Sequence, residues 1–376
     1  MKIAALDILN GAEEKTRTST RIPPLDPEPS ASTNSATSAT RMNMLPARVF
    51  VKTFLLMTIK KIIHVVNMKI FRNVEDIDQP FRNACVTIGN FDGVHHGHQQ
   101  LFATVVRTAQ SINGTSVVIT FDPHPLQVLL PEGIKLISTC QQKEELIGQS
   151  GIDVLLIVPF TKEFAKTTAD MFVKNLLVKK LGVKELVVGY DYAFGKGRSG
   201  NIDFLRQQGK IYNFPVTVVE ACYLGNQLVS STKIRELIRD GKMAEARELL
   251  GRHYQIRGTV RMGKQRGGKV IGFPTANLKF NEEDLVPRHG VYVTQVFCEG
   301  RQYGGVLNIG YNPTFGEEQL VAETHIFDFN EDIYGKPIKV NLLKFLRSEK
   351  KFSGPEELAE QINKDVLLAK KILAEQ

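Results

Sequence analysis

The feature that most constrains the fold is an alternation of short apolar runs with segments of helical periodicity between residues 68 and 240. Ala84–Ile88 and Val154–Val158 have the length and composition of buried strands. Gly97–Ile112 and Thr168–Leu181 place their apolar residues at helical spacing. Buried strands that alternate with helices are typical of a parallel sheet with helices on both faces. The sequence therefore predicts a doubly wound α/β domain.

The same alternation continues elsewhere in this region. Met68 opens a short predicted strand, further strands are predicted at 115–121, 185–189 and 216–219, and further helices at 143–148, 201–208 and 231–240. After Gly251 the pattern changes to closely spaced β-rich segments with glycine-dense turns, which predicts a small antiparallel barrel or sandwich. An amphipathic helix, Pro355–Leu373, is predicted last. The expected domains are an extension at 1–67, an α/β domain at 68–250 and a β-rich domain at 251–376.

The extension has two interpretations. Residues 12–47 are rich in Ser, Thr, Pro and Ala, a composition that predicts disorder. Residues 49–66 form an apolar run that several lysines interrupt, which would suit a membrane-surface or targeting helix. The alternative is a dispensable segment, with translation starting at Met68. We favour this alternative because the folded pattern begins there.

The charge does not indicate a nucleic-acid-binding protein. The 376 residues carry a formal charge of +8, but residues 1–67 hold nine Lys/Arg against five Asp/Glu, which accounts for +4 of it. The remaining +4 is spread over the rest of the chain, and exposed aromatic residues interleaved with basic ones, which would favour single-stranded nucleic acid, are not evident. We therefore expect no nucleic-acid partner.

The cysteines and the hydropathy indicate a cytoplasmic location. The four cysteines are isolated and form no CxxC pair, which argues against zinc ribbons and disulfide scaffolds. No uncharged apolar run reaches the roughly 18 residues that a membrane-spanning helix needs. The expected location is the cytoplasm, with no membrane partner.

The first candidate site follows the strand at 84–88, where the chain reads GNFDGVHHGHQQL (89–101). Glycine-rich backbone that opens a helix presents free N–H groups and the positive end of the helix dipole. His95 and His98 would stand over this point, and Gly97 would allow close approach of the backbone. Such a site stabilises charge that develops on the α-phosphate of a nucleotide. The alternative is surface or metal-binding histidines, although zinc would require a third ligand that the sequence does not offer.

Three other segments follow predicted strands, and ligand sites of open α/β sheets lie at those strand ends. VSSTKIR (229–235) is either a simple helix cap or a second phosphate clamp. GYDYAFGKGRSGN (189–201) is glycine-rich and places Asp191 just past a strand. TFDPHP (120–125) occupies the same position after another strand.

Together these motifs resemble the adenylyltransferase half of prokaryotic bifunctional riboflavin kinase/FAD synthetases. A class I tRNA synthetase shares the HxGH signature, but the anticodon-binding module and the Lys-rich signature loop are not found. The resemblance implies a Rossmann-like nucleotidyltransferase domain. It also implies that ATP is bound by Gly89, Phe91, Asp92, Gly93, His95, Gly97, His98, Asp191, Ser231, Thr232 and Arg235, with His95 and His98 catalytic, and that the flavin is bound by Asp122, Pro123 and His124. One departure is Tyr192-Ala193, where many relatives have Phe-Arg.

The second candidate site begins with GTVRMGKQRGGKVIGFPTANL (258–278), which lacks the GxxxxGK[ST] pattern of a P-loop. Thr275 and Asn277 lie two residues apart on an extended segment and would point to one face. Mg²⁺ takes such oxygen ligands together with nucleotide phosphates; the alternative is a polar turn. Glu323 in AETHIFDF either faces solvent or accepts a proton from a substrate hydroxyl.

This half resembles the riboflavin kinase module of the same family, most specifically in GFPTAN. The resemblance implies a small antiparallel β-barrel kinase domain with a C-terminal helix. It implies that Glu323 is the catalytic base, that Gly258, Gly263, Lys264, Gly268, Thr275 and Asn277 bind ATP, and that Thr275 and Asn277 hold Mg²⁺. Residues 344–362 match a segment that borders the flavin site in relatives. Asn312 departs from the arginine that many members carry.

The resemblance covers about residues 68–376 and implies a reaction sequence. The barrel would convert riboflavin and ATP to FMN, and the α/β domain would convert FMN and a second ATP to FAD and pyrophosphate. The expected partners are the small molecules riboflavin, FMN and ATP, with Mg²⁺ as cofactor; homo-oligomerisation is open. The competing hypothesis is a flavin-binding or regulatory protein in which one site is degenerate.

Overall fold

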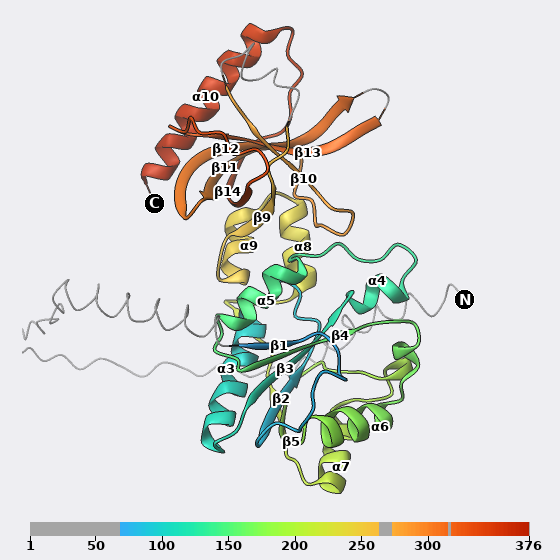
Figure 1. Cartoon of the computed structure of the whole chain (residues 1–376). Coiled ribbons are helices and arrows are strands. Elements are labelled where there is room, and N and C mark those ends of the chain that lie inside the picture. The colour runs from blue at the N-terminus through green and yellow to red at the C-terminus, as the bar shows by residue number, and fades with distance from the viewer. Residues whose placement is uncertain (1–67, 263–272, 315–316, 376) are drawn as a thin grey trace, which may run out of the picture. The chain divides into compact units, whose positions relative to one another are not determined.

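The computed structural model describes residues 68–262, 273–314 and 317–375 (Figure 1). The predictions made for residues 1–67, namely disorder, a membrane-surface helix and a start at Met68, lie outside these residues. No helix of the described chain is long and apolar enough to cross a membrane.

The first region contains a six-stranded sheet in the order β1-β4-β3-β2-β5-β6, and every neighbouring pair is parallel. The strands are β1 (Lys69–Phe71), β2 (Ala84–Ile88), β3 (Ser116–Asp122), β4 (Val154–Pro159), β5 (Val183–Gly189) and β6 (Val216–Val219). The short edge strand β1 pairs with β4 through Lys69–Val154 and its neighbours. Every residue of β2 is buried, as expected for a central strand covered on both faces.

Helices cover both faces of this sheet (Figure 1). They are α3 (His96–Ser111), α5 (Cys140–Gly148), α6 (Ala169–Met171), a π-helix (Phe172–Lys180) and α7 (Ile202–Tyr212). The short helix α4 (Pro125–Leu129) follows β3 and has no buried residue. Helix α3 packs through Phe102 and Val105 on one face of the sheet, together with Ile147 of α5. Leu177 of the π-helix and Leu205 of α7 pack on the other. The predicted doubly wound α/β fold is confirmed.

One predicted helix differs in its winding. The segment expected as a helix at 168–181 begins as α6 and continues as the π-helix, whose hydrogen bonds span one residue more than those of an α-helix. Phe172, Val173, Leu176 and Leu177 are all buried. The apolar spacing that predicted a helix is therefore compatible with this wider turn as well.

The second region is an antiparallel six-stranded sheet in the order β10-β13-β12-β11-β14-β9. The strands are β9 (Tyr254–Thr259), β10 (Ala276–Lys279), β11 (Gly290–Cys298), β12 (Arg301–Thr314), β13 (Glu317–Ile326) and β14 (Pro337–Arg347). An isolated bridge brings the two edges together, with the N–H of Arg261 donating to the carbonyl of Asn277 at 2.9 Å. The sheet thus closes almost completely, which confirms the barrel.

Helix α10 (Pro355–Ala374) covers part of the outer face of the barrel (Figure 1). Its Ala369 is buried among Val291, Val293 and Val306 of the strands β11 and β12. The predicted C-terminal helix is therefore confirmed, and it packs on the face opposite to the barrel interior.

The apolar core of the barrel includes residues from two helices that precede the barrel strands. Two helices, α8 (Ser231–Arg239) and α9 (Met243–Leu250), contribute Leu237, Ile238 and Leu249 to one apolar cluster with Tyr254 and Leu342 of the barrel strands. Helix α9 was not among the predicted elements. Both helices precede residue 251, so the apolar packing groups them with the barrel although the sequence pattern groups them with the α/β region.

Candidate active sites

The loop after β2 lies where the order of the parallel sheet reverses. From β2 the chain moves outward to β3 and β4, and it then returns to the opposite side of β2 as β5. Open α/β sheets bind ligands at such a switch point, beyond the carboxyl ends of the strands. Gly93 takes φ of 82°, and Phe91 and Val94 also have positive φ values of 51° and 41°. This tight loop leads directly into the start of α3.

His95 and His98 stack at the N-terminus of α3. Their ring centroids are 3.6 Å apart with an interplanar angle of 19°. His95 is the N-cap, and its Nδ1 accepts the backbone N–H of His98 at 3.4 Å. This bond leaves Nε2 of a neutral His95 ring as the donor. A Cβ on Gly97 would contact the His95 ring at 3.3 Å, so the glycine permits the close approach.

Both histidines are neutral at physiological pH. Burial lowers the pKa of His95 to about 4, and the positive charges of Arg252, His96 and Arg235 lower it further against the opposing effect of Asp92. Burial also lowers the pKa of His98 well below its usual value. Two neutral imidazoles beside free helix N–H groups can donate hydrogen bonds to a phosphate, and they need not lose a proton to do so.

Asp92 and Arg235 form a buried ion pair. The Nη2 of Arg235 lies 2.6 Å from Oδ2 of Asp92, and both side chains are less than a tenth exposed. Asp92 also accepts the backbone N–H groups of Ile137 and Ser138 at 3.1 Å. Arg235 donates a further bond through Nε to the carbonyl of Lys135 at 2.9 Å. This pair connects the loop after β2 to α8. The charge of Arg235 is compensated by Asp92.

The start of α8 contacts the same loop. The Oγ of Ser231 donates to the carbonyl of Asp92 at 2.9 Å, whereas Thr232 is exposed. The N-cap is Ser230, whose Oγ accepts the N–H of Lys233 at 3.2 Å. The structure thus brings Ser231 to the histidine loop and assigns the capping role to the residue before it.

The remaining predicted residues lie at the carboxyl ends of β3 and β5. Asp122 and Pro123 are exposed at the end of β3. His124 is buried and caps α4 through Nδ1, which accepts the N–H of Leu126 at 3.1 Å. Burial lowers the pKa of His124 to about 4. Asp191 is exposed just beyond β5.

Two cations at this site were not predicted, the half-buried Arg252 and the buried Lys143. Arg252 donates to the carbonyl of Gly93 at 2.6 Å and to that of Val94 at 3.3 Å. Lys143 of α5 donates to the carbonyls of Asn90 and Phe121. Sequence reasoning missed both because an isolated Lys or Arg usually marks a solvated helix face, and no motif surrounds either residue.

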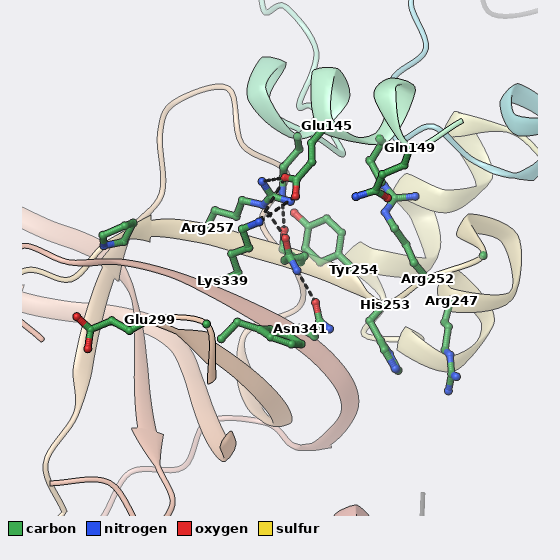
Figure 2. A pocket seen from close by; sticks show the side chains of 17 residues that line it. Glu145, Gln149, Arg247, Arg252, His253, Tyr254, Arg257, Glu299, Lys339 and Asn341 are labelled. Carbon is green, nitrogen blue, oxygen red and sulfur yellow. Dashed lines mark hydrogen bonds and ion pairs between the residues drawn. The ribbon is translucent and has the colours of Figure 1, made fainter. Parts of the chain in front are cut away.

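Helix α5 is also fixed on its other side. Glu145 accepts from Arg257 of β9 and from Lys339 of β14, with N–O distances of 2.5 and 3.0 Å, beside a cavity of about 660 Å³ (Figure 2). Burial alone would raise the pKa of Glu145, but the hydrogen bonds from Lys339 and Arg257 outweigh it and hold the pKa below its usual value. Gln142 adds a bond from Nε2 to the carbonyl of Gln255 at 3.0 Å.

In the barrel, strand register places Glu323 between two asparagines. Glu323 of β13 is the register partner of Asn277 on β10 and of Asn308 on β12. Directly opposed residues project from the same face of a sheet. The adjacent residues Ala322 and Thr324 are buried, so Glu323 projects from the face opposite to the barrel core. Asn308 has no predicted role, and its pairing with Glu323 depends on register alone.

The segment that carries Thr275 is anchored to β13. His325 forms a hydrogen bond through Nδ1 with the carbonyl of Pro274 at 2.9 Å, and its ring packs edge-on against Phe273 at 5.2 Å. The Nδ2 of Asn277 donates to the carbonyl of Thr275 at 3.3 Å, which leaves the amide oxygen of Asn277 as an acceptor. Thr275 and Asn277 thus supply a hydroxyl and an amide oxygen, donors that suit Mg²⁺ when phosphates complete the shell.

The glycine-rich flap can be placed only in part. Gly258 lies in β9 facing Leu278, whose Cδ2 would be 3.3 Å from an added Cβ. Gly263, Lys264 and Gly268 lie outside the described residues. Within the described residues no three His, Cys, Asp or Glu side chains gather as a metal cluster.

The C-terminal segment approaches the same outer face. The carboxylate of Glu349 lies against Gly310, which follows Asn308 by two residues, and a side chain at Gly310 would collide with it. Residue 349 belongs to the segment 344–362, which the family resemblance predicts beside the flavin. No sequence motif identifies Glu349. Its contact with Gly310 follows from the path of the chain after β14, so the sequence alone does not predict it.

Comparison with known proteins identifies the family. The FAD synthetase family model matches residues 77–233, and the riboflavin kinase family model matches residues 250–373. Bifunctional riboflavin kinase/FMN adenylyltransferase from Buchnera aphidicola (subsp. Schizaphis graminum) is 36% identical over 309 residues, covering 81% of this chain and 98% of the relative. The Escherichia coli K12 protein of the same name is 37% identical over 306 residues, covering 81% and 97%. This chain belongs to that bifunctional family.

A solved structure supports the fold over both regions. The crystal structure described as a macrolide-efflux protein from Streptococcus pneumoniae is 32% identical, with a TM-score of 0.73, and the match covers 81% of this chain and 99% of that one. The family indicated by the sequence motifs is therefore confirmed, with its FAD synthetase region before its riboflavin kinase region.

Proposed function

We propose that the chain makes FAD from riboflavin in two steps, at two separate sites. The barrel phosphorylates riboflavin with ATP to give FMN, and the α/β region adenylylates FMN with a second ATP to give FAD and pyrophosphate. Both activities are those of the family, and ATP and flavins are its substrates and products. The observation that carries the site assignment is the stack of His95 and His98 on the N-terminus of α3, at the switch point of the sheet.

Adenylyl transfer needs charge stabilisation at the α-phosphorus of ATP. An oxygen of the FMN phosphate attacks this phosphorus, the bond to the β-phosphate oxygen breaks, and pyrophosphate leaves. The neutral rings of His95 and His98, with the free N–H groups of α3, donate to the oxygens on which charge grows. Losing one such donor costs roughly 2.7–4 kcal/mol in the barrier, or about 100- to 1000-fold in rate.

Phosphoryl transfer in the barrel needs a base and a positioned nucleotide. Glu323 accepts the proton of the 5′-hydroxyl of riboflavin while that oxygen attacks the γ-phosphorus of ATP, and ADP leaves. Thr275 and Asn277 would hold Mg²⁺, which when bound neutralises charge on the phosphates. The approach of Glu349 to the same face supports a flavin position beside residues 344–362.

The proposal assigns residues 68–250 to the adenylyltransferase and 251–376 to the kinase, with α8 and α9 packed on the kinase barrel. Its partners are the small molecules riboflavin, FMN and ATP, in the cytoplasm. Nucleic acids and membranes are not among them.

A crossed substitution experiment tests the two assignments. The full chain is incubated with riboflavin, ATP and Mg²⁺, and the flavins are separated by chromatography over time. Glu323→Gln should lower FMN formation by roughly 100-fold or more while supplied FMN still becomes FAD. His98→Ala should lower FAD formation by about 100-fold or more and leave FMN formation unchanged.

Matched controls are Glu299→Gln on the barrel surface and Gln100→Ala on the exposed side of α3, and both should retain both activities. Equal loss of both activities in either test variant would refute the two-site assignment. FAD formation at the parent rate in His98→Ala would remove this histidine from the chemistry.

A further inference from the structure

Lys143 is a buried cation that joins two of the loops at the adenylyltransferase site. Its side chain extends from α5 to the carboxyl ends of β2 and β3 and is buried. The Nζ donates to the carbonyl of Asn90 at 3.3 Å and to that of Phe121 at 3.1 Å. Asn90 belongs to the loop that carries the histidines, and Phe121 precedes the residues expected to bind the flavin.

The charge of Lys143 has no ion-pair partner among the described residues. The buried carboxylate of Asp92 is paired with Arg235, the carboxylate of Glu144 is paired with Arg72, and Asp122 is exposed. Burial lowers the pKa of Lys143 against the opposing effects of Cys140 and of the carboxylates of Asp92, Asp122 and Glu144. A buried charge is costly unless an opposite charge and hydrogen bonds compensate it. An ammonium group has three donors, and the two carbonyls account for two of them.

Lys143 lies beside residues of both motifs of the adenylyltransferase site. Its charge adds to the lowering of the pKa of His98 and of His124, after burial, which is the main cause in both. It therefore lies near the two motifs that the proposed function assigns to ATP and to the flavin. On the opposite side of α5, Glu145 is bonded to Arg257 and Lys339 of the barrel strands (Figure 2). Gln142 donates to the carbonyl of Gln255, and these bonds hold α5 at the site.

We propose that Lys143 is a phosphate-binding residue of the adenylyltransferase site, and that its third N–H donor and its charge are directed at a phosphate oxygen of FMN or of ATP. This inference rests on the proposed function of the α/β region. The two carbonyl bonds orient the ammonium group, and the phosphate supplies the ion-pair partner that Lys143 lacks among the described residues.

The test separates the charge of Lys143 from its hydrogen bonds. Lys143→Gln keeps donors for the two carbonyls but has no charge, and Lys143→Met has neither. The full chain is assayed for FAD formation at varied FMN with ATP saturating, and then at varied ATP with FMN saturating. Both variants should raise the KM for the substrate whose phosphate Lys143 contacts by roughly 10- to 150-fold. Lys143→Arg should recover part of that loss.

The two titrations show whether Lys143 contacts the phosphate of FMN or that of ATP. A rise confined to the KM for FMN assigns the contact to the flavin phosphate, and a rise confined to the KM for ATP assigns it to the nucleotide. FMN formation in the barrel reports on folding and should stay at the parent rate in every variant. Lys210→Gln, an exposed lysine on α7, is the matched control and should behave as the parent chain.

Parent-like KM values in Lys143→Gln would overturn the proposal, because the residue would then act only by joining the loops. If Lys143→Met fails to fold, the KM values of Lys143→Gln still test the proposal. Failure of the proposed function is a different result, in which His98→Ala retains FAD formation whatever the Lys143 variants do.

Discussion

The two proposed active sites differ in how deeply their residues are built into the fold. In the α/β region, His95, Asp92 and Arg235 are buried and bonded to one another or to the backbone. In the barrel, Thr275 and Glu323 are half-buried on the outer face of the sheet. Residues of the first site therefore contribute both to the stability of the fold and to the proposed chemistry. Substitution of residues in the second site should have little effect on the packing of the core.

This difference has a consequence for how each site responds to mutation. Removing one member of a buried, bonded set leaves its partner desolvated and unpaired, which costs stability as well as activity. Replacing a half-buried side chain on a sheet face leaves the backbone ladder and the core intact. Stability and activity should thus be coupled in the α/β region and separable in the barrel.

The largest expected effect is that of Asp92→Asn. The substitution leaves the guanidinium of Arg235 buried without its counter-charge, and breaking a buried pair in this way typically costs about 3–5 kcal/mol. Urea unfolding should show this loss, accompanied by loss of FAD formation. Asp203→Asn, which breaks an exposed pair with Arg206, should cost roughly 0–1 kcal/mol. Equal stability of the two variants would contradict the scaffold role of Asp92.

A slightly smaller effect is expected for Leu237→Ala, which tests where the barrel core ends. Leu237 of α8 is buried in the cluster that contains the barrel strands, and such a truncation costs about 2–5 kcal/mol. FMN formation should therefore be lost at a lower temperature, although residue 237 precedes the barrel. Leu367→Ala on the exposed side of α10 is the control and should change little, since that side chain is 70% exposed. Unchanged heat resistance of FMN formation in Leu237→Ala would place α8 outside the barrel core.

Counted per residue, the smallest of the three effects is the acid sensitivity that neutral His95 and His124 give to the α/β region. Burial lowers the pKa of His95 and of His124 to about 4, so the unfolded chain takes up protons first as the pH falls. The stability that neutral histidines contribute is complete above about pH 6.5 and is lost progressively as the pH falls toward 4, by roughly 3 kcal/mol or less for each.

Urea unfolding of the full chain at a series of pH values, followed by circular dichroism, measures this loss. The double variant His95→Gln, His124→Gln should show a shallower pH dependence than the parent chain. An identical slope in both proteins would mean that other groups cause the acid sensitivity.

Much of the fold could be predicted because it depends on local pattern. The strand at 216–219 is found where it was predicted, and α3 begins one residue from the predicted start, because periodicity and capping are short-range properties. The switch-point loop was found because its glycines and histidines are adjacent in sequence. The identity of the family likewise depends on contiguous motifs such as GFPTAN.

The rest depends on contacts between distant residues. Asp92 and Arg235 are 143 positions apart, and no local pattern shows that they neutralise each other. Asn308 meets Glu323 only through strand register. Lys143 reads in sequence as an ordinary helical lysine, and its burial follows from the packing of α5 against the ends of two strands. Residues of this kind are assigned by tertiary structure alone.

Helix α8 sets a limit on exchanging modules between members of this family. Its first turn contacts the histidine loop through Ser231, while its apolar side belongs to the core of the barrel. A chimera that joins the α/β region of one member to the barrel of another at residue 250 would transplant this helix away from its core partners. A junction before Val229 would keep the core whole but would import a foreign Arg235 against the native Asp92. Either junction therefore separates α8 from one of the two sets of residues that it contacts.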